Sequence, residues 1–446
     1  FRSGRRWTWA PSFSLGWNIA QEEFWRDFTP YCNLLKLRAS YGSLANQNTK
    51  VWYPTYRTMS IGQANGSWLI NGKRPATTWV NGLVSSGLTW EKVRTWNIAL
   101  DWGLFNNRLT GTFDAFIRYT DDMVGKAVQL PATLGLDPPS ANNCDLKTNG
   151  WELTLAWRDR TSFGLNYGVS FNLSDARTYI RRYPGNATQS IWSYNNGREI
   201  NEIWGYETIG IAKSKAEMDA HLEAVGGQES LGWDWNEGDI MYRDLDGNPG
   251  INSGAETLDD HGDLRVIGNS TPRLFYGIDI NASYKGFDIR AFFQGVGKRD
   301  FFSYSPIFWG VTSNMWWSAA LGEHQDYYRG KDLGLPDRII PANTDAYYPR
   351  PVFAQDKNQK AQTRYLQDAS YIRLKNLQVG YTIPQELSRK FFVQNLRLYV
   401  SVDNLWTHTK LSKVFDPETI NGGYNGSYGN AYPLSRTWAF GLSLTL

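Results

Sequence analysis

The sequence contains few of the residues on which disulfide scaffolds, zinc sites and histidine-based catalysis depend. Among its 446 residues there are two cysteines, Cys32 and Cys144, and four histidines. Two cysteines cannot form a disulfide framework, and no cysteine–histidine cluster has the spacing of a zinc site. The sequence also lacks a Gly-x-Ser-x-Gly motif and a glycine-rich phosphate loop. It therefore offers neither a nucleophilic triad nor a nucleotide site.

The chain also lacks a long apolar run and an excess of charge of one sign. No stretch of 18 or more apolar residues occurs, and the mean hydropathy is −0.49, which excludes a helical membrane span. Lys and Arg number 46 against 43 Asp and Glu, so the formal net charge is +3 and no nucleic-acid partner is expected. Aromatic residues make up 15% of the chain, which excludes intrinsic disorder.

What the chain does contain is a period-two alternation of apolar and small polar residues, the pattern of a strand with two differently solvated faces. At 437–445, Trp438, Phe440, Leu442 and Leu444 alternate with Thr, Ala, Gly and Ser. The same alternation occurs at 109–119, 151–158, 164–173, 274–284 and 287–293. A barrel strand needs only every second residue to face lipid, so hydropathy windows miss it.

The composition of the two faces favours a barrel over a packed sandwich. The polar face is rich in Asn, Gly, Ser and Thr, as expected of a wet lumen, and aromatic pairs such as Trp102 with Phe105 and Tyr284 with Phe287 flank the short turns. Such pairs are typical of the interfacial girdle of a membrane barrel. Aromatic capping of a soluble sheet is the alternative interpretation.

Short and long connections alternate strictly. Short turns at 106–107, 159–160 and 285–286, and a longer one at 384–394, alternate with irregular segments at roughly 44–93, 121–147, 178–270, 299–366 and 407–435. Outer-membrane barrels have this asymmetry, with tight periplasmic turns and long extracellular loops. The sequence therefore predicts an all-β fold: a transmembrane, antiparallel, up-and-down β-barrel in the outer membrane.

About eleven membrane strands are predicted. They lie near 11–20, 34–43, 94–104, 108–120, 148–158, 162–174, 272–284, 287–297, 370–382, 395–406 and 436–446, with one further strand-like piece at 201–212 outside the bilayer. Bacterial single-chain barrels close with an even number of strands, so at least one more is expected before Phe1. This topology puts Cys32 in a periplasmic turn and Cys144 in an extracellular loop, so the two should not pair.

Five stretches of the chain have a distinctive sequence: LKLRASYGSLANQN within 34–48, LTWEKVRTWNIALDWGLFNNRLTGTFDAF at 88–116, GDIMYRDLDGNPGIN at 238–252, VIGNSTPRLFYGIDINASYKGFDIRAFFQGVG at 266–297 and YIRLKNLQVGYTIP at 371–384. These stretches resemble the SusC-type TonB-dependent transporters of Bacteroidetes outer membranes. They occur in family order over nearly the whole chain, and the 238–297 block is the most specific.

The resemblance implies a 22-stranded barrel occluded by an N-terminal plug, with residues 1–446 supplying the C-terminal part of its wall and neither the plug nor other N-terminal domains. It also implies a SusD-like surface lipoprotein as a lid, and energy from TonB delivered through the absent plug. The implied cargo is an oligomeric nutrient, a glycan more often than a peptide. This function requires no cofactor, and one loop is a candidate calcium site.

That loop is Asp244-Leu-Asp246-Gly-Asn248, which has oxygen ligands at alternate positions, as the first half of a calcium loop does. Pro249 occupies the sixth position and Ala255 the twelfth, and Asp259, Asp260 and Asp263 are displaced downstream. The spacing of a closing acid is therefore broken. A calcium site and a plain Asx-rich turn both remain open.

The long connections are rich in tryptophan, whose flat face stacks on sugar rings and whose fixed side chain loses little entropy on binding. These residues are Trp68, Trp79, Trp192, Trp204, Trp233, Trp235, Trp309, Trp316 and Trp317. Contact with cargo or with the lid is expected for some of them, and the last seven are the main candidates. Stiffening of the loops is the plain alternative.

Two rival functions remain open. The first is a secreted, aromatic-rich carbohydrate-binding or hydrolytic β-protein, suggested by Glu237 and Asp239 beside Trp233 and Trp235. Paired acids near aromatic residues are common in solvated loops, so no catalytic residue is assigned and the protein is not expected to be an enzyme. The second rival is a structural or adhesive barrel without energy coupling.

Overall fold

The computed structural model describes residues 1–47, 49, 52–63, 69–126, 131, 133, 135, 136, 138–311, 318, 320–420 and 431–445. The chain divides into two compact units. One comprises residues 1–106, 112–152 and 176–200, and the other residues 107–111, 153–175 and 201–446.

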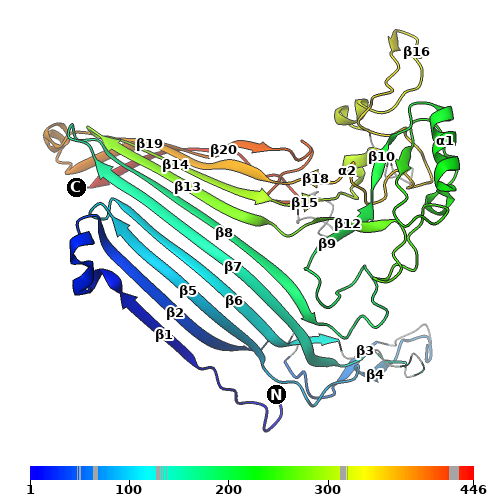
Figure 1. Cartoon of the computed structure of the whole chain (residues 1–446), viewed down its shortest axis with the longest axis horizontal. Coiled ribbons are helices and arrows are strands. Elements are labelled where there is room, and N and C mark those ends of the chain that lie inside the picture. The colour runs from blue at the N-terminus through cyan, green and yellow to red at the C-terminus, as the bar shows by residue number, and fades with distance from the viewer. Residues whose placement is uncertain are drawn as a thin grey trace. The chain divides into compact units, whose positions relative to one another are not determined.

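Eleven long strands form one antiparallel sheet, in which each strand pairs with the next of the eleven along the chain (Figure 1). They are β1 (Ser12–Asn18), β2 (Cys32–Asn46), β5 (Glu91–Leu104), β6 (Leu109–Lys126), β7 (Ser140–Arg160), β8 (Asn166–Arg182), β13 (Arg273–Tyr284), β14 (Phe287–Lys298), β19 (Tyr371–Thr382), β20 (Asn395–Thr409) and β21 (Thr437–Thr445). The eleven predicted strands and their up-and-down order are therefore confirmed.

Several strands are longer than predicted. β6 runs to Lys126 instead of 120, β7 begins at Ser140 instead of 148, and β8 continues to Arg182 instead of 174. The prediction was wrong at these ends because it followed the alternation of apolar and polar residues. Near these ends polar and charged residues occupy both faces of the strand, so the alternation disappears although the backbone ladder continues.

The register of β8, β13 and β14 shows the two faces of the sheet directly. Ile280 of β13 lies opposite Val169 of β8 and Ala291 of β14. Val169 and Ile280 are 39% and 40% exposed, so this apolar face is uncovered. One position along, Asp279 lies opposite Ser170 and forms an ion pair with Arg290 on the polar face. A large uncovered apolar face is unusual for a protein surface in water.

Aromatic side chains gather at the end of the sheet that carries the short turns. Phe163 contacts Tyr284 with 5.8 Å between ring centroids, and Phe287 contacts Tyr381 at 4.5 Å. Lys285 and Gly286, between β13 and β14, both have positive φ, as a two-residue hairpin turn of type I′ requires. The predicted aromatic girdle is present at this edge.

The segment 178–270, predicted to be irregular apart from a strand-like piece at 201–212, is ordered instead. It contains β9 (Glu202–Tyr206), β10 (Thr208–Ile211), α1 (Lys215–Val225), η4 (Glu229–Leu231), β11 (Ile240–Tyr242) and β12 (Leu264–Asn269) (Figure 1). β9 pairs with β12 and β10 with β11, in sheets separate from the eleven strands. Ser214 caps α1 by accepting a hydrogen bond from the backbone of Glu217, and Gly226 ends it in the left-handed conformation.

The remaining elements are short. They are η1 (Ile19–Gln21), η2 (Glu23–Phe28), β3 (Met59–Gln63), β4 (Ala76–Val80), β15 (Asp300–Phe301), α2 (Pro306–Trp309), η6 (Gly322–Gln325), β16 (Leu333–Leu335), β17 (Arg338–Ile340), β18 (Gln367–Asp368), α3 (Gln385–Ser388) and η7 (Arg389–Phe391). Cys32 and Cys144 are free thiols, as predicted. Among the described residues, no helix combines the length and the apolar character needed to cross a bilayer.

Candidate functional site in the long connections

The structure divides the candidate tryptophans by burial. Trp192 and Trp233 are 54% and 63% exposed, whereas Trp204, Trp235 and Trp309 are 5–8% exposed. The indole of Trp309 donates to the carbonyl of Ser303 and packs among aromatic rings of the same unit. The burial of these three residues favours the alternative, in which they stiffen the connections.

Trp79 packs in the small β3–β4 hairpin and is 39% exposed. Trp68, Trp316 and Trp317 lie outside the described residues. Contact with cargo or lid thus stays a prediction for Trp192 and Trp233, the two candidates in the described chain that present most of their side chain to solvent.

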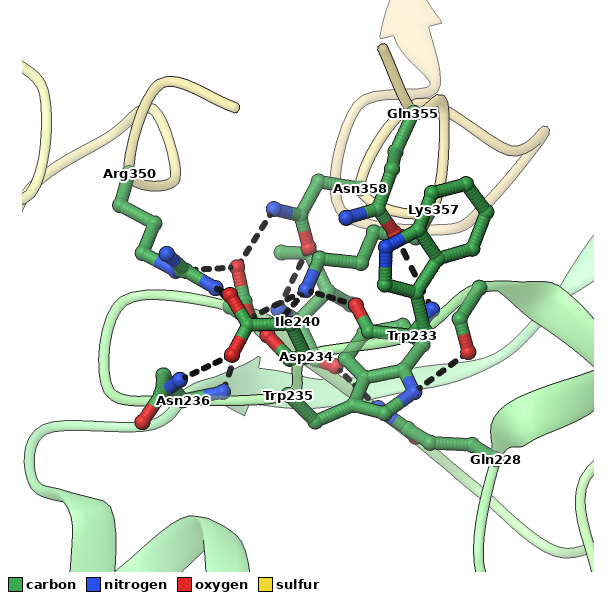
Figure 2. Close-up of polar contacts among 12 residues, drawn as sticks. Gln228, Trp233, Asp234, Trp235, Asn236, Ile240, Arg350, Gln355, Lys357 and Asn358 are labelled. Carbon is green, nitrogen blue, oxygen red and sulfur yellow. Dashed lines mark hydrogen bonds and ion pairs between the residues drawn. The ribbon is translucent and has the colours of Figure 1, made fainter. Parts of the chain in front are cut away.

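In the connections at 201–270 and 299–366, the carboxylate of Asp239 is fully buried and has several charged and polar partners. Arg350 binds it with two nitrogens, Nε to Oδ1 at 2.8 Å and Nη2 to Oδ2 at 2.9 Å. Lys357 Nζ lies 2.9 Å from Oδ2, and the amide of Asn358 donates to Oδ1. The backbone N–H of Asn236 also donates to Oδ2. Figure 2 shows these partners converging from two segments far apart in the sequence.

Lys357 is 1% exposed, and every donor of its ammonium group has a partner. Besides Asp239, it donates to the backbone carbonyls of Trp233 and Asp234, and it lies 4.6 Å from the ring of Trp235 (Figure 2). Burial lowers the pKa of Lys357, and the hydrogen bond and charge of Asp239 oppose that effect. The cluster therefore fastens the 233–239 loop to the 350–358 segment.

This geometry removes the glycosidase interpretation of Glu237 and Asp239. A catalytic carboxylate must reach the glycosidic oxygen or the anomeric carbon. Asp239 is instead enclosed, with its oxygens occupied by Arg350, Lys357 and Asn358. Asp239 thus has a structural explanation.

A cavity of about 320 Å³ adjoins this cluster. Its described lining is mainly aromatic and aliphatic and includes Trp309, Leu321, His324, Tyr348 and Val352. Both ring nitrogens of His324 are occupied, because Nδ1 accepts from the backbone of Leu321 and Nε2 lies 2.9 Å from the carbonyl of Ile307. His324 therefore supports the wall of the cavity and offers no nitrogen to a ligand.

The Asp244 loop combines features of both earlier interpretations. Asp244 accepts from the backbone of Gly247, and Asp246 accepts from that of Asn248, as in Asx turns. Carboxylate oxygens of Asp244, Asp246 and Asp263 also lie within 4.8 Å of one another. The third carboxylate comes from Asp263, which lies too far along the sequence to be the closing acid of a calcium loop.

Asp263 is fully buried, and its oxygens accept from the backbone of Leu245 and Asn252. Burial raises the pKa of Asp263, the two backbone hydrogen bonds lower it, and the charges of Asp246 and Asp244 raise it further. Three converging carboxylates with this mutual repulsion form a donor set that suits a hard divalent cation.

The partners of Asp239 could not be predicted from the sequence. Arg350 and Lys357 lie 111 and 118 residues away from it, since the contacts join positions 239, 350 and 357. No local motif links these positions. The exposed aromatic residues and the Asp-rich loop, by contrast, carried local signals.

Residues 1–405 match the family described as TonB dependent receptor-like, beta-barrel. TonB-dependent receptor P3 of Formosa agariphila is 27% identical over an alignment covering 100% of this chain and 42% of that protein. TonB-dependent receptor SusC of Bacteroides thetaiotaomicron is 25% identical, with 100% and 40% covered. The chain thus spans about two fifths of the length of these curated relatives.

A solved structure, described as that of the RagAB peptide transporter, superposes with a TM-score of 0.74 at 21% identity and covers 100% of this chain and 44% of the matched chain. This agreement concerns the fold. Together with the family match over 1–405 and the uncovered apolar face of the sheet, it leads to one assignment. The chain belongs to the TonB-dependent receptor β-barrel family, whose members are proteins of the bacterial outer membrane.

Proposed function

We propose that residues 1–446 form the C-terminal part of the wall of a SusC-type importer, which takes up an oligomeric nutrient through the outer membrane with energy from TonB. The observation that carries the proposal is the family match over the eleven-stranded sheet. The apolar face of the sheet then contacts lipid, and the polar face lines the lumen. The secreted alternative is set aside, because this family lies in the outer membrane.

The proposal includes a complete barrel of 22 strands, a plug that TonB engages, and a SusD-like lipoprotein that covers the long connections. The similarity to SusC supports this arrangement, as does the greater length of the relatives. Because the family consists of transporters, the chemistry proposed for the chain is binding and passage of cargo, not catalysis.

An oligosaccharide is the cargo we propose, since the exposed indoles of Trp192 and Trp233 suit stacking on sugar rings. The name of the RagAB structure makes a peptide the specific alternative.

The test is to purify the transporter that contains this chain in mild detergent and to identify by mass spectrometry what co-purifies. We expect a surface lipoprotein and bound oligosaccharide. Bound peptides would reverse the cargo proposal, and the absence of any lipoprotein would contradict the lid.

Changing Trp192 and Trp233 to Ala tests these two residues separately from the fold. We expect growth on the identified cargo to slow at limiting concentration, because each substitution removes an exposed indole while the barrel is untouched. Trp79→Ala, in the β3–β4 hairpin, is the matched control. Equal growth of all strains, at equal amounts of folded protein in the outer membrane, would show that the two residues contact neither cargo nor lid.

We also propose that Asp244, Asp246 and Asp263 bind calcium. Substituting Asp244→Asn together with Asp246→Asn keeps both Asx-turn acceptors, because the amide oxygen accepts as the carboxylate does, but removes two negative charges. In calorimetric titration of the detergent-purified transporter, we expect calcium to release or absorb heat with the unchanged protein, and this signal to be lost in the variant. Identical heats would leave the plain Asx turn as the explanation.

A further inference from the structure

On the lipid-facing side of the first unit, exposed hydrophobic residues give way to charged ones at a sharp boundary. In β5, Ile98 and Trp96 are 62% and 59% exposed, and the next residue on the same face is Arg94. In β6, Phe113 and Ile117 are each 40% exposed, and the next residue on that face is Tyr119. The boundary lies at the end of the strands that carries the long connections, which is the extracellular end in barrels of this type.

Three cations surround the ring of Tyr119. The guanidinium carbons of Arg181 and Arg94 lie 5.1 Å and 5.8 Å from its centroid, and Lys147 Nζ lies at 6.0 Å. These three residues come from three different strands, β8, β5 and β7. Shared contact with one ring fixes all three on the lipid-facing side, because Tyr119 lies on the same face of β6 as Phe113 and Ile117. We call these four residues the Tyr119 cluster.

The charges around the Tyr119 cluster are only partly balanced. Arg94 and Arg181 share the single carboxylate of Asp121, at 2.5 Å and 3.2 Å. Lys147 forms no ion pair among the described residues. Arg177, which lies on the same face of β8 as Arg181, forms none there either. The adjacent Arg182 is balanced by Asp122 and Asp145. Positive charge therefore exceeds negative charge at this boundary.

The exposure of these side chains leaves room for a further anion. The side chains of Arg94 and Arg181 are 47% and 45% exposed, while Asp121 between them is 15% exposed. Arg177 is exposed as well. A guanidinium presents donors in a fixed fork that matches phosphate oxygens, so one phosphate group is able to bind two such side chains at once.

We propose that the Tyr119 cluster, with Arg177, binds the phosphorylated headgroup of an outer-leaflet glycolipid. An amphipathic ligand fits because apolar and cationic surfaces follow one another along the same strands: acyl chains meet Trp96, Ile98 and Ile117, and phosphate meets the cations above them. The site lies on the outward, lipid-facing surface of the strands and not on the long connections. A membrane lipid reaches this surface, whereas a soluble protein outside the cell meets the connections instead. The proposal uses the outer-membrane location and is independent of the cargo.

The test uses the detergent-purified transporter that contains this chain, titrated with lipid A and followed by native mass spectrometry. Lys147→Gln with Arg177→Gln removes two cations that have no ion pair among the described residues, so folding should be preserved. We expect the apparent affinity for phosphorylated lipid A to fall by at least about tenfold, since each cation near an anionic headgroup contributes on the order of 1 kcal/mol. Arg118→Gln, next to Tyr119 in sequence but on the lumen side, is the control and should bind as the unchanged protein does.

A second variant combines Arg94→Gln, Arg181→Gln and Asp121→Asn. It removes the remaining two cations together with the carboxylate that they share, so no unpaired charge is left. It should weaken binding similarly, and dephosphorylated lipid A should bind weakly to every form. Undiminished binding by the Lys147→Gln, Arg177→Gln variant would overturn the proposal, as would equal binding of dephosphorylated lipid A. Displacement of lipid A by low millimolar inorganic phosphate would also overturn it, because the site would then recognise the free anion.

Discussion

Replacing Asp239 by Ala is expected to destabilise the connections at 201–270 and 299–366 by about 3–5 kcal/mol, the cost of removing one partner from a buried ion pair. The reason is the pair of cations left behind. Lys357 is 1% exposed and would keep only backbone carbonyls and the ring of Trp235 as partners. Arg350 would keep the exposed carboxylate of Asp234 at 3.5 Å.

Hydrogen exchange of the folded transporter measures this effect locally, because the barrel strands should be unaffected. We expect faster exchange in peptides covering 228–242, which contains β11 and the carbonyls of Trp233 and Asp234 that accept from Lys357, and in peptides covering 350–362, which contains Arg350 and Lys357. Asp345→Ala is the control: Asp345 pairs with Lys213 at 3.4 Å but is 94% exposed, and exposed pairs contribute little.

A double variant separates charge imbalance from simple loss of contacts. Asp239→Ala with Lys357→Met removes the buried cation together with its acid, and replacing buried charges by apolar side chains often restores stability. We expect exchange in 228–242 to return part of the way toward the unchanged protein. If Asp239→Ala alone left exchange unchanged, the cluster would not be what holds the two segments together.

The strands could be predicted from the sequence because each one records its two environments in neighbouring residues. Val169 and Ser170 are adjacent in β8, yet one is uncovered on the apolar face and the other lies opposite Asp279. The prediction failed where that contrast ends, as at the last residues of β6 and β8, where polar and charged residues occupy both faces of the strand. Alternation of apolar and polar residues shows that the two faces of a strand meet different environments, and a strand whose faces meet similar environments does not have it.

The interior of the connections was harder to predict, for two reasons. The start of α1 carries a local signal, which is Ser214 followed three residues later by Glu217. This capping motif lies within 178–270, a segment that the alternation pattern predicts to be mostly irregular. The Asp239 cluster carried none, because its partners come from a segment more than a hundred residues away. For the same reason, spacing identified Asp244 and Asp246 but not Asp263, which the fold brings to them.

The second large effect is expected where the sheet meets lipid. Val169→Arg should destabilise the barrel by about 2–4 kcal/mol, the range for a cation near the bilayer midplane of an outer-membrane barrel. Val169 is 39% exposed on the apolar face, opposite Ile280, which lies midway along β13 between Tyr276 and Tyr284. A side chain at that depth has no water or carboxylate within reach on the lipid side.

Ser170→Arg is the matched control, since it adds the same charge one residue along the same strand. Ser170 faces the lumen opposite Asp279, which already pairs with Arg290, so the added guanidinium meets water and a carboxylate. Heat-modifiable mobility on gels and urea unfolding in lipid vesicles measure both variants. We expect a large loss of folded barrel for Val169→Arg and little loss for Ser170→Arg. Equal losses would mean that the two faces do not meet different solvents, and the assignment of the apolar face to lipid would then be wrong.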